Sequence, residues 1–90
     1  MQLIQEKDQS YYLENGDKKA YILHPEKNGV LTIKTVFVNE ELRGQGLASK
    51  TMHDLYDYCK RNNLKVIALC PYAVMWFKRN KDKRDILVEE

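Results

Sequence analysis

The sequence predicts a fold of the α/β (α+β) class, in which a mostly antiparallel, twisted sheet carries one parallel β-α-β crossover and two helices. Asn15-Gly16 stands between two strand-like runs and is a strong signal for a β-hairpin. Apolar residues between positions 46 and 62 recur with helical spacing. Residues 64–69 are almost continuously apolar, as is typical of a strand covered on both faces. With 90 residues, the chain is expected to form a single domain spanning residues 1–90.

The first 38 residues are typical of an antiparallel meander. Residues 10–13 and 18–24 predict two strands, one on each side of the Asn15-Gly16 turn. Residues 25–29 contain proline, asparagine and glycine and therefore predict a second turn. Residues 30–38 are rich in β-branched and aromatic side chains, which predicts one long strand.

A helix is predicted over residues 46–62. Ala48, Met52, Leu55 and Cys59 follow one another at helical spacing, so they are expected to form its buried face. The helix is expected to end at residues 62–63, because asparagine tolerates the left-handed backbone of a helix C-cap. A strand, a helix and a second strand make a crossover unit, so residues 30–38 and 64–69 are expected to pair in parallel.

The last twenty residues predict a second, shorter helix. Pro71 suits the first turn of a helix, which is expected to reach about residue 80. Trp76 is expected to anchor this helix to the sheet. Residues 78–85 are highly charged and predict a loop, and residues 86–88 predict a short closing strand.

The charge balance and the apolar pattern exclude several classes of protein. Fifteen Lys and Arg residues against thirteen Asp and Glu residues give a formal net charge of +2, which argues against a nucleic-acid-binding domain. The apolar runs are far shorter than the roughly 18 residues of a membrane span. The N-terminus shows no basic patch followed by an apolar run, so no secretory signal is expected. We therefore expect a cytoplasmic protein that binds neither nucleic acid nor membranes.

The cysteines and histidines do not form a metal motif. Cys59 and Cys70 lie eleven positions apart, which matches no common zinc spacing, and His24 and His53 are isolated in the sequence. No metal is therefore expected, and the thiols are expected to be reduced. Cys59 is interpreted as a core residue of the helix, and both histidines as surface or rim residues.

The segment between the strand-rich half and the first predicted helix has the chemistry of an anion site. The first turn of a helix presents unpaired backbone N–H groups and a partial positive charge. Glycines let a ligand approach the backbone closely, and an arginine adds a fixed cation. The segment lacks the Gly-Lys-Ser/Thr of a Walker loop and the third glycine of a dinucleotide fingerprint. It consists of Arg43, Gly44, Gln45, Gly46, Leu47 and Ala48.

This segment resembles the Arg/Gln-x-x-Gly-x-Gly/Ala motif of the GNAT superfamily of N-acetyltransferases, in which the loop binds the pyrophosphate of acetyl-coenzyme A (acetyl-CoA). Together with Cys70-Pro71-Tyr72, it resembles a minimal, single-domain GNAT-like family, from about Tyr11 to the end of the chain. The resemblance implies a GNAT-like acyl-CoA N-acyltransferase fold. It also implies an acetyl-CoA-dependent N-acetyltransferase whose amine acceptor is a small molecule or a protein.

The resemblance also suggests roles for individual residues. A backbone N–H near Phe37 and Val38 would polarise the thioester carbonyl. Cys70 is either a nucleophile that takes the acetyl group or a residue that lines the thioester pocket. Tyr72 either donates a proton to the departing thiolate or packs over the cofactor arm. The basic residues within 78–84 form a solvated face or contact the 3′-phosphate of coenzyme A.

One departure from the family pattern supports a second hypothesis. Many members carry a histidine in the strand before the loop, where this chain has Thr35. That histidine has been considered a catalytic group, so its replacement favours a non-catalytic module that binds coenzyme A or acyl-CoA. Transfer by direct attack, transfer through an acetyl-Cys70 intermediate and binding without transfer therefore remain open at this point.

Overall fold

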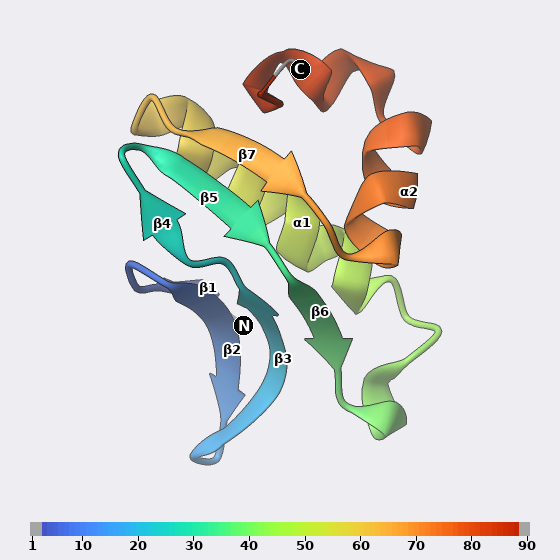
Figure 1. The fold of residues 1–90 in the computed structure, drawn as a ribbon. Helices are drawn as coiled ribbons and strands as arrows, with labels where there is room; N and C mark the ends of the chain where they lie inside the picture. Colours follow the sequence, from blue (N-terminus) through green and yellow to red (C-terminus); the bar gives the residue numbers. More distant parts are fainter. Residues whose placement is uncertain (1–2, 89–90) are drawn as a thin grey trace.

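The computed structural model describes residues 3–88 and combines two small sheets with two helices (Figure 1). The helices are α1 (Leu47–Arg61) and α2 (Pro71–Arg79), and η1 (Glu40–Leu42) and η2 (Lys81–Ile86) are 3-10 helices. The strands are β1 (Leu3–Gln5), β2 (Gln9–Glu14), β3 (Asp17–Leu23), β4 (Glu26–Lys27), β5 (Val30–Ile33), β6 (Thr35–Val38) and β7 (Lys65–Ala68). This is the predicted α+β architecture.

The predicted hairpin and the predicted parallel pair are both present. Strands β2 and β3 pair antiparallel around Asn15 and Gly16, whose positive φ angles of 53° and 83° suit a tight hairpin turn. The antiparallel sheet has the order β1-β2-β3-β6, and the second sheet has the order β4-β5-β7. Within the second sheet, β5 and β7 are parallel, with Val30 opposite Lys65 and Ile33 opposite Ala68.

The prediction of one long strand over residues 30–38 is wrong. The strand is interrupted at Lys34, and its two halves, β5 and β6, belong to different sheets. The backbone N–H groups of Leu69 and Cys70 both donate to the carbonyl of Ile33, at 3.0 Å, whereas the N–H of Lys34 donates to Leu23, at 2.9 Å. Ile33 is therefore the last residue that β7 holds, and β6 turns away to pair with β3 (Figure 1).

Helix α1 has nearly the predicted limits and most of the predicted buried face. Gly46 is its N-cap and Asn62 its C-cap, and Met52, Leu55 and Cys59 are buried. Ala48 is only half-buried and packs instead against a smaller cluster around Tyr12. The helix lies behind β5 and β7 in Figure 1. The main core lies between the sheets and the helices and consists of Ile22, Leu31, Ile33, Met52, Leu55, Cys59, Val66, Ala73, Trp76, Phe77 and Ile86.

The C-terminal segment is more ordered than its charge suggested. Helix α2 begins at Pro71, as predicted, and Trp76 is buried in the core. The predicted loop is largely the 3-10 helix η2, because its last residue, Ile86, is drawn into the core. The predicted closing strand is reduced to a single bridge between Leu87 and Val66.

The interpretation of His24 as a surface or rim residue is wrong. Its side chain is fully buried, and its Nε2 lies 2.6 Å from the hydroxyl oxygen of Ser10. Ala20, Ile22 and His24 alternate along the chain and so point to the same, core side of the sheet. Burial lowers the pKa of His24, because a charged imidazole loses its hydration there.

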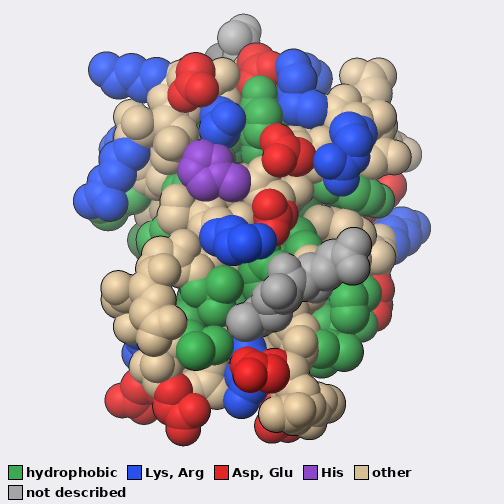
Figure 2. Space-filling model, turned by 180° about the vertical axis from the view of Figure 1, so that it is seen from behind, with side chains coloured by type: hydrophobic (Ala, Val, Ile, Leu, Met, Phe, Trp, Pro, Cys, Tyr) green, Lys and Arg blue, Asp and Glu red, His purple; other side chains and the backbone are tan. Residues whose placement is uncertain are grey.

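The outer surface is mixed in charge. Seen from behind, acidic and basic side chains alternate around apolar patches (Figure 2). Among the described residues, no helix is long and apolar enough to cross a membrane.

Candidate functional site

The loop before α1 has an open backbone. Gly44 and Gly46 have φ angles of 83° and 77°, which side chains other than glycine rarely adopt. A Cβ atom added at either position would have no neighbour within 4 Å, so the protein itself leaves this side of the loop open. Gly46 is the N-cap of α1 and provides no side-chain cap. The first N–H groups of the helix therefore face an open approach, which is the arrangement that binds phosphate.

A cavity of about 230 Å³ lies against this loop. It joins the end of β6, the loop and the first turns of α1 and α2. The cavity is lined by Val38, Leu42, Arg43, Gly44, Gly46, Leu47, Ala48, Ser49 and Tyr72. The structure thus brings together Tyr72 and most of the residues that the sequence marked for cofactor binding. Phe37, Gln45 and Cys70 do not line the cavity.

Phe37 and Val38 differ in what they present to this cavity. Asn39 donates its N–H to the carbonyl of Lys19, at 2.7 Å, so by antiparallel alternation the N–H of Phe37 also faces β3. The N–H of Val38 faces the opposite edge of β6, where no described strand pairs with it. The ring of Phe37 stacks on that of Tyr21, 4.9 Å away, on the sheet face opposite the core. Of the two residues, Val38 therefore has the free backbone donor.

Arg43 is held at the end of β6. Its Nε donates to the carbonyl oxygen of Val38, at 3.1 Å, and its guanidinium lies 5.9 Å from the ring of Phe37. The side chain is exposed. The hydrogen bond uses only one of its five N–H groups, so the rest of the guanidinium can bind an anion at the rim of the cavity.

Tyr72 and Ser49 face the cavity from α2 and α1. The pKa of Tyr72 is raised by burial, although the charge of Arg79 and the hydroxyl of Ser49 act in the opposite direction. The indole Nε1 of Trp76 donates to Oγ of Ser49, at 3.1 Å. The sequence analysis did not single out Ser49. The signal was available, because Ser49 lies three residues after the N-cap glycine and so belongs to the exposed first turn.

The two cysteines occupy different environments. Cys70 is the N-cap of α2, half-buried, and packs against the main core. Cys59 is fully buried, as predicted, and burial raises the pKa of its thiol to about 12. The structure places His53 beside Trp76, with ring centroids 4.9 Å apart, and neither His53 nor His24 lines the cavity at the loop. Within residues 3–88, no group of three or more His, Cys, Asp or Glu side chains could hold a metal ion.

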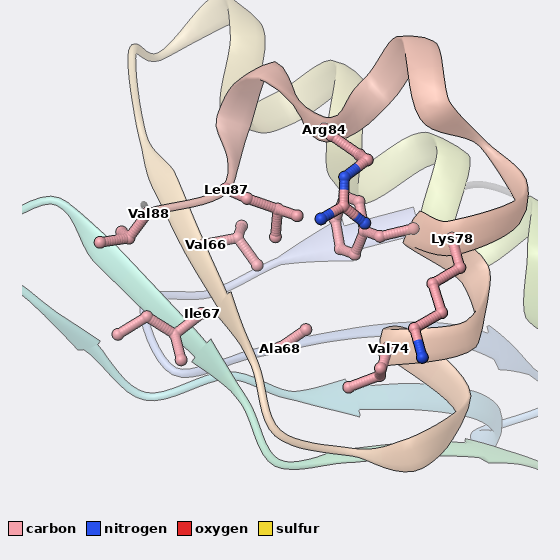
Figure 3. A pocket seen from close by; sticks show the side chains of 9 residues that line it. Val66, Ile67, Ala68, Val74, Lys78, Arg84, Leu87 and Val88 are labelled. Atoms are coloured by element: carbon pink, nitrogen blue, oxygen red, sulfur yellow. The ribbon is translucent and has the colours of Figure 1, made fainter. Parts of the chain in front are cut away.

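A second cavity, also of about 230 Å³, lies along the outer edge of β7 (Figure 3). Val66, Ala68 and Leu87 form part of its apolar lining, and the side chains of Lys78 and Arg84 extend over it. No residue lines both cavities. The cavity at the loop therefore gives no support to a contact between residues 78–84 and the 3′-phosphate of coenzyme A.

The fold and the loop together define a class of protein. The edge of β6 that no described strand covers lies beside an open helix N-terminus, an arrangement suited to a long phosphate-bearing ligand. The chain belongs to the GCN5-related N-acetyl-transferase family, whose model matches residues 10–86. A comparison with curated protein sequences finds no match.

Solved structures share the fold. A GCN5-like protein from Staphylococcus aureus, determined by NMR, has a TM-score of 0.76 and 24% identity, over 99% of this chain and 89% of that one. The ribosomal-protein-S18-alanine N-acetyltransferase of Escherichia coli has a TM-score of 0.66 and 14% identity, over 84% of this chain and 54% of that one. Tetrahymena GCN5 has a TM-score of 0.65 and 12% identity, over 94% and 63%. The chain thus spans 54% and 63% of the length of these two larger proteins.

Proposed function

We propose that this chain, acting as one domain, transfers the acetyl group of acetyl-CoA to an amine. The observation that supports this most directly is the cavity in which Tyr72 meets the loop from Arg43 to Ala48. The family uses acetyl-CoA, and the site has the groups that such a cosubstrate needs. These are an anion cradle, a free strand N–H and a protonated phenol.

In this proposal the pyrophosphate lies on the loop. The N–H groups of Gln45, Gly46 and Leu47 and the start of α1 point at the phosphate oxygens, and the helix dipole favours the negative charge. Arg43 adds a charge-assisted hydrogen bond from the rim. Ala48 is small enough to let the pyrophosphate approach the first turn.

The thioester carbonyl accepts a hydrogen bond from the N–H of Val38, which has no strand partner. This donor stabilises the negative charge that develops on the oxygen when the amine attacks. A C–N bond forms, the C–S bond breaks and the amine loses a proton to solvent. The departing thiolate takes a proton from Tyr72, whose raised pKa keeps the phenol protonated at neutral pH.

Direct attack by the amine fits the geometry better than an acetyl-Cys70 intermediate. Tyr72 lines the cavity, whereas Cys70 does not. The backbone of Cys70 links β5 to α2. Its N–H donates to the carbonyl of Ile33, at 3.0 Å, and its carbonyl accepts from the N–H of Val74, at 3.0 Å. We therefore assign Cys70 a structural role at the start of α2.

Two observations favour the alternative of a non-catalytic acyl-CoA-binding module. Neither histidine lines the cavity, and Thr35 replaces the histidine that many family members carry. In the alternative, coenzyme A binds in the same place, but no acetyl group is transferred to an amine. The two proposals therefore predict the same binding and different chemistry.

The experiment combines binding with product analysis. Trp76 is the only tryptophan and bonds to Ser49 in the cavity wall, so its fluorescence should report coenzyme A binding. Acetyl-CoA is then incubated with a panel of amines, and released coenzyme A and acetylated amine are measured by chromatography and mass spectrometry. Tyr72→Phe is expected to lower kcat by about 100-fold or more while keeping affinity. Tyr21→Phe, on the far face of the sheet, is the control.

Each other outcome has a clear meaning. Binding without release of coenzyme A would support the non-catalytic module. A hydroxylamine-sensitive acetyl group on the protein, absent from Cys70→Ala, would establish the covalent route instead of direct attack. Unchanged turnover in Tyr72→Phe would exclude Tyr72 as the acid. Absence of any coenzyme A binding would refute the assignment of the loop.

A further inference from the structure

We infer that Ser49 is a positioning residue for Tyr72: it receives a hydrogen bond from Trp76 and donates its own proton to the phenol oxygen. The inference rests on the proposed function, because it gives Tyr72 a partner that stabilises the phenolate formed when the proton leaves. It concerns a side chain outside the motifs that the sequence analysis identified.

The structure brings the side chains of Ser49, Tyr72 and Trp76 close to the same cavity wall. Tyr72 and Trp76 are four residues apart in α2 and therefore lie on the same side of that helix. Ser49 faces them from the first turn of α1, with its Oγ 3.1 Å from the indole nitrogen of Trp76. Trp76 is 3% exposed, so its N–H depends on Ser49 for a partner. Ser49 and Tyr72 line the same cavity.

The direction of the hydrogen bonds follows from the chemistry of the indole. An indole N–H can only donate, so the Ser49 oxygen must accept from Trp76. The hydroxyl of Ser49 then has one proton left to donate, and Tyr72 is the other hydroxyl-bearing side chain that lines the same cavity. The hydroxyl of Ser49 acts to lower the pKa of Tyr72, which is the effect of a donor on a phenolate.

This arrangement strengthens as Tyr72 loses its proton. A hydrogen bond to an anion is shorter and stronger than one to a neutral group, and the bond from Trp76 polarises the Ser49 hydroxyl further. Arg79 of α2 acts on Tyr72 through its charge, Arg43 of the loop lines the same cavity, and the titratable ring of His53 packs on Trp76.

The test measures the phenol directly in the free protein. Tyrosines are replaced by 3,5-difluorotyrosine, which lowers every phenol pKa, and the Tyr72 fluorine signal is assigned from Tyr72→Phe. Ser49→Ala is expected to raise the pKa of this residue by about 0.5 to 1, which is the loss of one hydrogen bond. Ser49→Thr keeps the hydroxyl and should restore the original value. Thr51→Val removes a hydroxyl that bonds to Leu47 within the helix and should have no effect.

A double-variant cycle tests the relay. Trp76→Phe keeps a ring but removes the N–H donor, so it should raise the Tyr72 pKa by a smaller amount, and this effect should vanish in the Ser49→Ala background. In turnover, Ser49→Ala should lower kcat several-fold and leave the KM for acetyl-CoA unchanged.

An unchanged Tyr72 pKa in Ser49→Ala, or additive effects in the cycle, would overturn the inference. Because the titration uses no acetyl-CoA, its result does not depend on whether the chain transfers acetyl groups. Failure of the proposed function would appear separately, as absent turnover in the wild-type protein.

Discussion

Replacement of Gly46 by alanine should separate the two roles of this residue, backbone conformation and access of the ligand. At a φ of 77°, a side chain carries a steric cost of about 1–2 kcal/mol. Gly16 is a matched control, because it has a φ of 83° and an equally open surrounding, but it lies in the β2–β3 turn. Gly46→Ala and Gly16→Ala should therefore lose similar stability.

Their effects on ligand affinity should differ. The added methyl group of Gly46→Ala points into the space that the protein leaves open, where we propose that the pyrophosphate meets the backbone N–H groups. Loss of one hydrogen bond to a charged group costs about 1.5–3 kcal/mol, which corresponds to roughly a 10- to 100-fold weaker Kd. Gly16→Ala should bind coenzyme A like the wild type.

Two measurements on the same proteins decide the question. Thermal unfolding should show Tm losses of about 4–8 °C for each kcal/mol in both variants. Isothermal calorimetry with coenzyme A should show weaker binding only for Gly46→Ala. Wild-type affinity in Gly46→Ala, alongside a normal loss of Tm, would show that the pyrophosphate binds elsewhere.

Two further predictions concern buried groups. Because the pKa of His24 is lowered in the folded state from a value of 6.5, the unfolded chain binds its proton first as the pH falls. The contribution of His24 to the free energy of unfolding should therefore be constant above about pH 6.5 and fall below it, by at most about 1.4 kcal/mol per pH unit. Urea unfolding at several pH values should show that His24→Gln lacks this part of the slope. Equal slopes in the two proteins would contradict the prediction. In the native protein, iodoacetamide should label half-buried Cys70 well before buried Cys59, whose pKa is raised to about 12. In urea, both cysteines should be labelled. Equal labelling rates in the native protein would contradict the burial of Cys59.

Local signals predicted the parts of the fold that depend on neighbours in the sequence. The Asn15-Gly16 hairpin, the limits of α1 and the start of α2 at Pro71 each rest on backbone preferences of a few residues. The same holds for the open loop at Gly44 and Gly46, whose positive φ angles only glycine adopts readily. These features survive in the tertiary structure because nothing in the packing opposes them.

Features that depend on distant contacts could not be predicted in this way. Residues 30–38 have continuous β propensity, and only the competition between β3 and β7 for their backbone divides them at Lys34. His24 follows the inward alternation of Ala20 and Ile22, but a histidine is usually placed outside unless a partner such as Ser10 is known. The proposed role of Ser49 depends on the packing of α2, which brings Trp76 within hydrogen-bond distance and places Tyr72 in the same cavity wall.

The break at Lys34 connects the fold to the site. Ile33 accepts the N–H groups of both Leu69 and Cys70, so β7 ends where β6 departs, and Pro71 then starts α2 immediately beyond. Two consequences follow from this one change of partner. The outer edge of β6 is left with the free N–H of Val38, and Tyr72 is carried to the loop that follows β6. If Lys34 continued a single strand alongside β7, a strand would occupy the edge at which we propose that the thioester binds. The division of residues 30–38 between two sheets therefore creates both the open edge of β6 and the cavity beside it.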